Sequence, residues 1–179
     1  MNNLQPWLTA ILANPVTKQP CQPEAFNNVQ GVIDARVFLK NTHGYSDWAE
    51  SQHSYEESSE NRENTAEGYQ LIINYDRPIY QHYPMTGRIL DCGGGIGTVR
   101  EFLANDVEFV STDPWLQAPF AISATRKAVY TCVNRPLNFI GATAEFLPFI
   151  ANQFDWVHMR SMLDHVQVAD LALLEAWRV

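Results

Sequence analysis

Short apolar runs alternate with longer mixed segments in the second half of the chain, and this pattern predicts an α/β fold. Four runs have the length and apolar character of buried strands, and they cover residues 88–92, 107–113, 138–141 and 154–159. The segment after the first run has helical spacing at Val99 and Phe102, and Thr98 with Glu101 predicts a capping box at its start. Strands that alternate with helices build a mostly parallel, doubly wound sheet with helices on both faces. Right-handed crossovers then favour the strand order 3-2-1-4.

Two further helices and a less regular N-terminal part complete the pattern. A helix is expected over residues 69–80, interrupted near Pro78 because proline lacks the N–H that continues a helix. A second, amphipathic helix is expected over residues 170–179. Nearer the N-terminus, residues 8–13 predict a short helix or strand, and residues 31–39 have strand character.

The first strand of the predicted sheet runs into a glycine-rich turn. Asp91 ends the strand, and Gly93, Gly95 and Gly97 follow at alternate positions. Residues without a side chain let a ligand lie directly against the backbone. The turn is therefore the first candidate for a binding site.

Two classes of ligand compete for such a turn. A dinucleotide-binding turn needs glycines at positions i, i+2 and i+5. The i+5 position is Thr98 when counted from Gly93 and Arg100 when counted from Gly95, so this fingerprint does not fit. The carboxylate of Asp91 suits a ligand with positive charge and opposes a pyrophosphate. The pattern resembles motif I of the Rossmann-like (class I) S-adenosylmethionine-dependent methyltransferases, whose cofactor carries a sulfonium and an amino group.

Downstream segments extend this resemblance in order and spacing. Asp113 ends the second strand, 22 positions after Asp91. An acid at the tip of the neighbouring strand is placed to hold both ribose hydroxyls. Residues 142–149 resemble the family's segment beside the adenine, and residues 154–165 resemble its fourth strand and the start of the next helix. The resemblance covers residues 87–179 and implies S-adenosylmethionine as the cofactor.

The resemblance also implies which residues bind the cofactor. They are Asp91, Gly93, Gly95, Gly97, Asp113, Thr143, Ala144, Glu145 and Arg160. Thr143 stands where the family has an aspartate beside the adenine. Adenine binding should therefore rest on the hydroxyl of Thr143 or on the backbone of Ala144. By the same topology, Arg160 and Ser161 are expected near the cofactor.

In the implied reaction the main role of the protein is to position the reactants. The sulfonium already supplies an activated methyl group, so the protein has to align a nucleophile and exclude water. An acceptor hydroxyl or amine also needs a general base. His165, just past the fourth strand, is the candidate base, and the alternative is a histidine bonded to the backbone at a helix start. Cys92 is interpreted as an apolar filler rather than a nucleophile.

Composition and charge limit which classes of partner and which cellular location are expected. A chain of 179 residues with 46% apolar and 12% aromatic residues can form a packed core. Its formal charge of −8 argues against nucleic acid, whose binding depends on clustered Lys and Arg. The sequence has no apolar run near 18 residues and no basic leader, so neither a membrane span nor secretion is expected. Three scattered cysteines indicate no disulfide framework and no zinc site, and a cytoplasmic location is expected.

The chain divides into three parts. Residues 1–43 form a small segment that loosely resembles the zinc-ribbon domains of some methyltransferases, although a plain helix and hairpin fits as well. Asn14 and Thr17 occupy the ribbon's cysteine positions, so no metal is expected there. Residues 44–68 are acidic and read as a solvated linker or as a lid over the cofactor. The resemblance implies that residues 69–179 form the S-adenosylmethionine-binding domain.

The C-terminal end leaves two functions open. Family members continue past residues 170–179 into three more strands, so the domain is expected to be incomplete. The fourth strand would then be an exposed apolar edge, which favours a homo-oligomer. The first function is methyl transfer to a small-molecule acceptor. The second is that of a non-catalytic module that binds the cofactor weakly or not at all.

Overall fold

One sheet organises the molecule. The computed structural model describes residues 4–40, 44–45, 49–50, 52–53 and 64–179. Within these residues six strands form a sheet in the order β1-β2-β5-β4-β3-β6. The strands are β1 (Asn27–Val29), β2 (Val32–Asp34), β3 (Arg88–Cys92), β4 (Glu108–Asp113), β5 (Phe139–Gly141) and β6 (Trp156–Met159). Neighbouring strands are parallel, apart from the antiparallel pair of β1 and β2.

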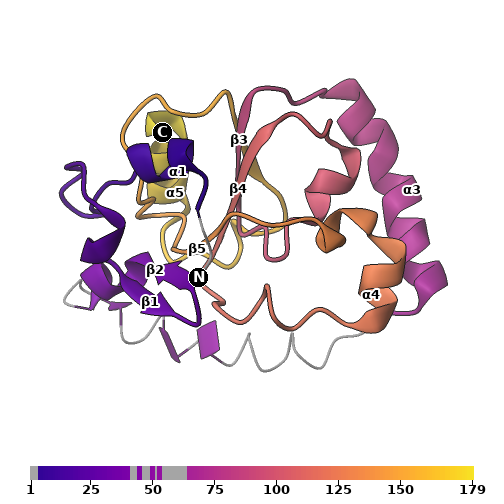
Figure 1. The fold of residues 1–179 in the computed structure, drawn as a ribbon, viewed down its shortest axis with the longest axis horizontal. Coiled ribbons are helices and arrows are strands. Elements are labelled where there is room, and N and C mark those ends of the chain that lie inside the picture. The colour runs from indigo at the N-terminus through magenta and orange to yellow at the C-terminus, as the bar shows by residue number, and fades with distance from the viewer. Residues whose placement is uncertain (1–3, 41–43, 46–48, 51, 54–63) are drawn as a thin grey trace.

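Helices cover both faces of this sheet. Helices α1 (Pro6–Ala10) and α5 (Ala169–Arg178) lie on one face, and α3 (Ala66–His82) and α4 (Ala124–Val129) lie on the other (Figure 1). Short 3-10 helices make the remaining turns, and they are η1 (Pro23–Ala25), η2 (Ala35–Leu39), η3 (Thr98–Phe102) and η4 (Thr131–Asn134). In the described part of the chain, every helix is too short or too polar to cross a membrane.

The central strands are buried on both faces, which explains their nearly continuous apolar runs. Ile89 of β3 and Phe109 of β4 pack with Tyr80 of α3 on one face. Leu90 and Val110, the next residues along the two strands, pack on the other face with residues of α1 and α5. Successive side chains of a strand point to opposite faces, so each strand contributes to both cores.

The predicted fold class is confirmed, and the sheet is larger than predicted. The four predicted strands are β5, β4, β3 and β6 in space, which is the order 3-2-1-4. In addition, β1 and β2 from the N-terminal segment extend the sheet beyond β5. The strand expected over residues 31–39 is shorter. It ends at Asp34, whose carboxylate accepts a hydrogen bond from the N–H of Arg36 and starts η2.

Two expectations about helices are wrong. Pro78 does not interrupt α3; it lies on an exposed side of the helix, where a carbonyl without an N–H partner can bind water. The capping box is absent, because Gly97 precedes η3 in the left-handed region and gives no side-chain cap. Glu101 accepts hydrogen bonds from the N–H of Cys132 at 2.9 Å and from the hydroxyl of Thr131 at 3.1 Å. Tertiary contacts therefore use the carboxylate that the local pattern assigned to the cap.

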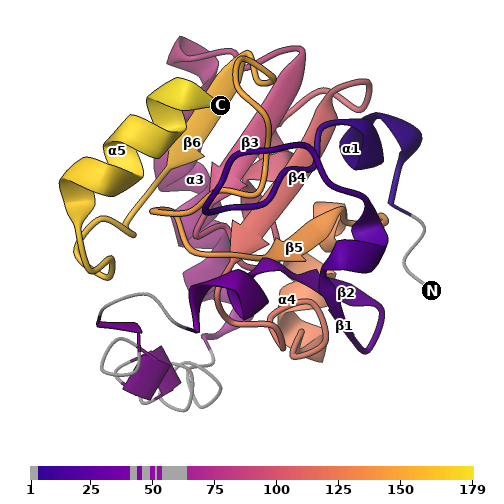
Figure 2. The same ribbon diagram turned by 90° about the vertical axis from the view of Figure 1, so that its left-hand side faces the viewer.

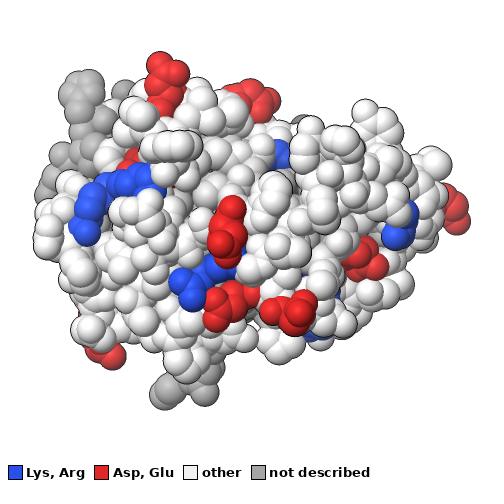
Figure 3. All heavy atoms as spheres, turned by 90° about the horizontal axis from the view of Figure 1, so that it is seen from above, with Lys and Arg blue, Asp and Glu red and all other residues white. Residues whose placement is uncertain are grey.

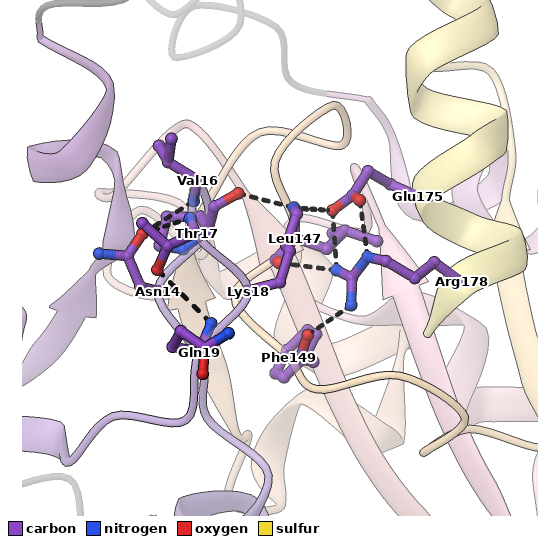
Figure 4. A network of polar contacts seen from close by, with 10 residues as sticks. Asn14, Val16, Thr17, Lys18, Gln19, Leu147, Phe149, Glu175 and Arg178 are labelled. Carbon is purple, nitrogen blue, oxygen red and sulfur yellow. Dashed lines mark hydrogen bonds and ion pairs between the residues drawn. The ribbon is translucent and has the colours of Figure 1, made fainter.

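An ionic network fastens the N-terminal loop to α5 (Figure 4). The side chain of Glu175 is 6% exposed and lies 2.5 Å from Lys18 Nζ and 2.7 Å from Arg178 Nε. The N–H of Leu147 donates to the same carboxylate at 2.9 Å. Arg178 in turn donates to the carbonyls of Leu147 and Phe149. One carboxylate thus joins three segments that are far apart in the sequence.

Burial and ion pairing shift the pKa values of this network in opposite directions. For Glu175 burial raises the pKa, but the hydrogen bonds and charges of Arg178 and Lys18 outweigh it and leave the pKa lowered. For Lys18 burial outweighs the attraction of the carboxylate, and the pKa is lowered. The two cations therefore stabilise the charged form of Glu175. For Lys18, burial disfavours the charged form more than the ion pair with Glu175 favours it.

The loop before Lys18 is closed by Asn14, one of the two positions aligned with ribbon cysteines. Its Oδ1 accepts hydrogen bonds from the N–H groups of Val16 at 2.9 Å and Thr17 at 3.0 Å. The N–H of Ala13 donates to the carbonyl of Pro148 at 2.9 Å. An amide side chain thus supports this turn, and the loop packs against the segment that follows β5.

Candidate functional site

A cleft opens at the carboxyl ends of the parallel strands, where ligands bind in open sheets of this kind. It encloses about 530 Å³, counting the space open to solvent. The glycine turn, the ends of β4 and β5 and the loop after β6 form its walls. The lining residues are Gln52, Gly93, Asp113, Pro114, Ala142, Thr143, Ala144, Glu145, Ser161, Met162, His165 and Val166.

The glycine turn gives the cleft one backbone wall. Gly93 lines the cleft with a φ of +67°, and a Cβ atom there would lie 2.8 Å from Cβ of Met162. Only glycine therefore fits this position without a shift of the loop after β6. Gly95 and Gly97 are not among the lining residues. They shape the turn, since the N–H of Gly97 donates to the carbonyl of Gly94 at 2.8 Å.

Asp113 lines the cleft, and its carboxylate is held by two backbone groups. Oδ2 accepts a hydrogen bond from the N–H of Gly95 at 3.0 Å. Oδ1 accepts one from the N–H of Trp115 at 2.9 Å. The side chain predicted to bind the ribose is therefore fixed in orientation by the protein.

Asp91 lies beneath the glycine turn and is not among the residues that line the cleft. Its side chain is 4% exposed, and its Oδ1 lies 2.7 Å from Nδ1 of His158, its direct neighbour on β6. His158 Nε2 lies 2.9 Å from the hydroxyl of Tyr80 in α3. Burial raises the pKa of Tyr80, so the phenol stays protonated beside His158. The charge assigned to the cofactor's sulfonium and amino group thus has a partner within the protein.

The segment after β5 supplies the opposite wall of the cleft. Thr143 is 5% exposed, and its hydroxyl has no hydrogen-bond partner among the described residues. A buried hydroxyl left unpaired costs about 1–3 kcal/mol, which a ligand that bonds to it would recover. Ala144 lines the cleft beside it. Glu145 also lines the cleft, while its Oε1 accepts a hydrogen bond from the N–H of Gln167 at 2.7 Å, just before α5.

The two site residues predicted after β6 lie in different surroundings. His165 lines the cleft with a side chain that is 44% exposed, and its Nε2 is 3.6 Å from Oδ2 of Asp164. Arg160 is not among the lining residues, and it forms an ion pair with Asp76 of α3. The hydrogen bond to Asp76 raises the pKa of Arg160 above its ordinary value. The structure thus brings His165, but not Arg160, to the cleft wall.

Cys92 has the environment of a core residue. It is 1% exposed at the end of β3, and burial raises the pKa of its thiol to about 12. The reactive form of cysteine is the thiolate, which is a minor species for such a group near neutral pH. This agrees with its interpretation as an apolar filler.

Several lining residues had no motif to reveal them. Pro114 follows the predicted acid directly, and Met162 approaches the glycine turn from the loop after β6. Gln52 comes from the acidic segment, where neither periodicity nor composition distinguishes it from its neighbours. Their positions depend on long-range packing, which single-sequence patterns do not contain.

Comparison with known families identifies the class of protein. The family described as a methyltransferase domain matches residues 90–179, which is half of the chain. The chain therefore belongs to this family, and the family implies S-adenosylmethionine as the cofactor. The matched region contains every cleft residue except Gln52. No curated protein matches the chain.

Three solved structures resemble the fold at low identity. The YcgJ protein from Bacillus subtilis is 22% identical over 59% of this chain and 46% of its own, with a TM-score of 0.44. The MccD protein is 26% identical over 64% and 50%, with a TM-score of 0.46. A putative S-adenosylmethionine-dependent methyltransferase from Methanococcus maripaludis is 15% identical over 66% and 60%, with a TM-score of 0.40. The chain thus spans between 46% and 60% of their length, and these likenesses are too distant to bear on function.

Proposed function

We propose that the chain binds S-adenosylmethionine in this cleft and transfers its methyl group to a small-molecule acceptor. One observation carries the proposal: three different groups suited to the cofactor line a single cleft. They are the backbone of Gly93, the oriented carboxylate of Asp113 and the hydroxyl of Thr143, which has no partner in the described part of the chain. They come from the ends of three adjacent strands, in a chain that belongs to a methyltransferase family.

Each of these groups fits a different part of the cofactor. The carboxylate of Asp113 would accept hydrogen bonds from both ribose hydroxyls. The hydroxyl of Thr143 and the backbone of Ala144 would bind the adenine. The backbone of Gly93 admits the close approach of the amino-acid part of the cofactor. When bound, S-adenosylmethionine supplies an activated methyl group on its sulfonium.

The remaining chemistry would fall to the residues after β6. His165 would accept a proton from an acceptor hydroxyl or amine as the methyl group is transferred. Its imidazole is partly exposed at the cleft wall, so an acceptor that enters from solvent can reach it. The walls formed by Met162 and Val166 would exclude water from the reacting atoms.

A small-molecule acceptor agrees with the charge of the chain. The formal charge of −8 opposes a phosphate backbone, and on the face in Figure 3 basic side chains lie beside acidic ones. The cysteines Cys21, Cys92 and Cys132 are free thiols, which agrees with the proposed cytoplasmic location.

Calorimetric titration of the purified chain tests the binding step. The parent protein should bind both S-adenosylmethionine and S-adenosylhomocysteine. Asp113→Ala should lower the affinity for both ligands by about 10- to 100-fold, since both carry the ribose diol. Asp106→Ala is the matched control, because Asp106 is an exposed aspartate just before the other end of the same strand. Equal affinities for Asp113→Ala and the parent would refute the ribose assignment. A parent that binds neither ligand would instead favour a non-catalytic module.

The transfer step needs a separate assay. The chain is incubated with methyl-labelled S-adenosylmethionine and a cell extract, and the label is followed in the dialysable and protein fractions. The label should enter the dialysable fraction, and His165→Gln should slow its transfer while leaving the affinity for S-adenosylhomocysteine unchanged. Label confined to protein would contradict a small-molecule acceptor.

A further inference from the structure

We infer that Arg36, from the N-terminal segment outside the family-matched region, is a positioning residue for Asp113 in the cofactor cleft. The inference rests on the proposed cofactor binding. It adds a requirement that residues 90–179 do not contain, because the carboxylate of Asp113 would depend on a guanidinium contributed by the N-terminal part of the chain.

The guanidinium of Arg36 is anchored at the carboxyl edge of the sheet. Its Nε donates to Oδ1 of Asp34 at 2.8 Å and its Nη2 donates to Oδ2 at 3.1 Å. The two side chains are 21% and 12% exposed. A bidentate pair of this kind fixes the plane of the guanidinium as well as its position. The third nitrogen is therefore aimed in a defined direction.

That third nitrogen reaches the turn after Asp113. Nη1 of Arg36 donates to the carbonyl of Pro114 at 2.7 Å. The carbonyl of Pro114 and the N–H of Trp115 belong to the same planar peptide unit. This N–H is the group that holds Oδ1 of Asp113 at 2.9 Å. By holding one end of the peptide, Arg36 orients the other end, and so it sets the direction of the carboxylate.

The sheet explains how a residue so distant in sequence arrives there. Asp34 of β2 is level with Gly141 of β5, and Gly141 is level with Asp113 of β4. The three residues form a row across the carboxyl edge, with β5 between β2 and β4 (Figure 2). A cation that bonds to a carbonyl also polarises the peptide and strengthens its N–H as a donor. Both effects favour one orientation of Asp113.

A double-mutant cycle separates this role from a general loss of stability. In the parent background, Arg36→Met should weaken the binding of S-adenosylhomocysteine by about 5- to 20-fold, a smaller loss than for Asp113→Ala because Arg36 acts through Asp113. In the Asp113→Ala background the same change should alter the affinity by less than about twofold, because coupled groups are not additive. Equal losses in both backgrounds, or no loss in the parent, would overturn the inference.

Two further variants keep the test decisive. Arg88→Met is the matched control, since Arg88 pairs with Glu108 and donates to the carbonyl of Gln153 at the opposite edge of the sheet. It should lower stability and leave the affinity unchanged. If Arg36→Met fails to fold, Arg36→Lys serves instead. It keeps a positive charge beside Asp34 but lacks the planar guanidinium with its several N–H donors, and it should still bind S-adenosylhomocysteine more weakly than the parent. A parent that binds no S-adenosylhomocysteine would refute the proposed function, whereas variants that bind as the parent does would refute only this inference.

Discussion

Glu175→Gln is expected to destabilise the chain more than the loss of one surface charge would. The substitution keeps the shape of the side chain and an oxygen that can accept the N–H of Leu147. It removes the negative charge that lies 2.5 Å from Lys18 Nζ and 2.7 Å from Arg178 Nε. Two cations are then left together in a site from which much of the water is excluded.

The magnitude follows from the burial of the three groups. Removing one partner of a fully buried ion pair costs about 3–5 kcal/mol. The side chains of Lys18 and Arg178 are 30% and 22% exposed, so water offsets part of this loss. We therefore expect a decrease in the free energy of unfolding of about 2–4 kcal/mol, or a fall in Tm of roughly 5–15 °C for a chain of this length.

Thermal and urea denaturation followed by circular dichroism measure this loss. Glu108→Gln is the matched control, because Glu108 pairs with Arg88 and its side chain is 42% exposed. Exposed pairs contribute about 0–1 kcal/mol, so this variant should unfold close to the parent. A decrease for Glu175→Gln no larger than that for Glu108→Gln would show that the network in Figure 4 does not stabilise the fold.

Three other outcomes are expected. The free energy of unfolding should fall as the pH drops below 4.5, the ordinary pKa of Glu175, because its pKa is lowered in the folded state; acid titration of Glu175→Gln should show a smaller fall. Metal analysis should find no stoichiometric zinc, since Asn14 and Thr17 do not supply thiolate ligands. Light scattering should detect self-association, because β6 pairs only with β3 among the described strands and Trp156 is 37% exposed. A stable monomer would contradict the last expectation.

The sequence predicted the central strands because burial on both faces leaves a strong local signal. Ile89, Leu90, Phe109 and Val110 alternate between two apolar cores, so β3 and β4 read as apolar runs. Asp113 was identifiable because it ends such a run at a definite distance from the glycine turn. These features depend on residues close together in the chain, which a sequence pattern records.

The contacts that orient the site depend on residues far apart in the chain. Asp91 is predicted to bind the cofactor, and the register of β3 and β6 also sets it beside His158, a contact that the sequence does not indicate. Glu101 matched a local capping box, yet η4 uses its carboxylate. The bond from Arg36 to Pro114 spans 78 positions and requires β2 to join the sheet next to β5. No local periodicity contains that information.

A structure of the chain determined with S-adenosylhomocysteine tests the central claim most directly. The ligand should occupy the cleft with its ribose hydroxyls on the carboxylate of Asp113, its adenine beside Thr143 and its amino-acid part over Gly93. A ligand bound at another surface, or an empty cleft at a saturating concentration of S-adenosylhomocysteine, would contradict the account.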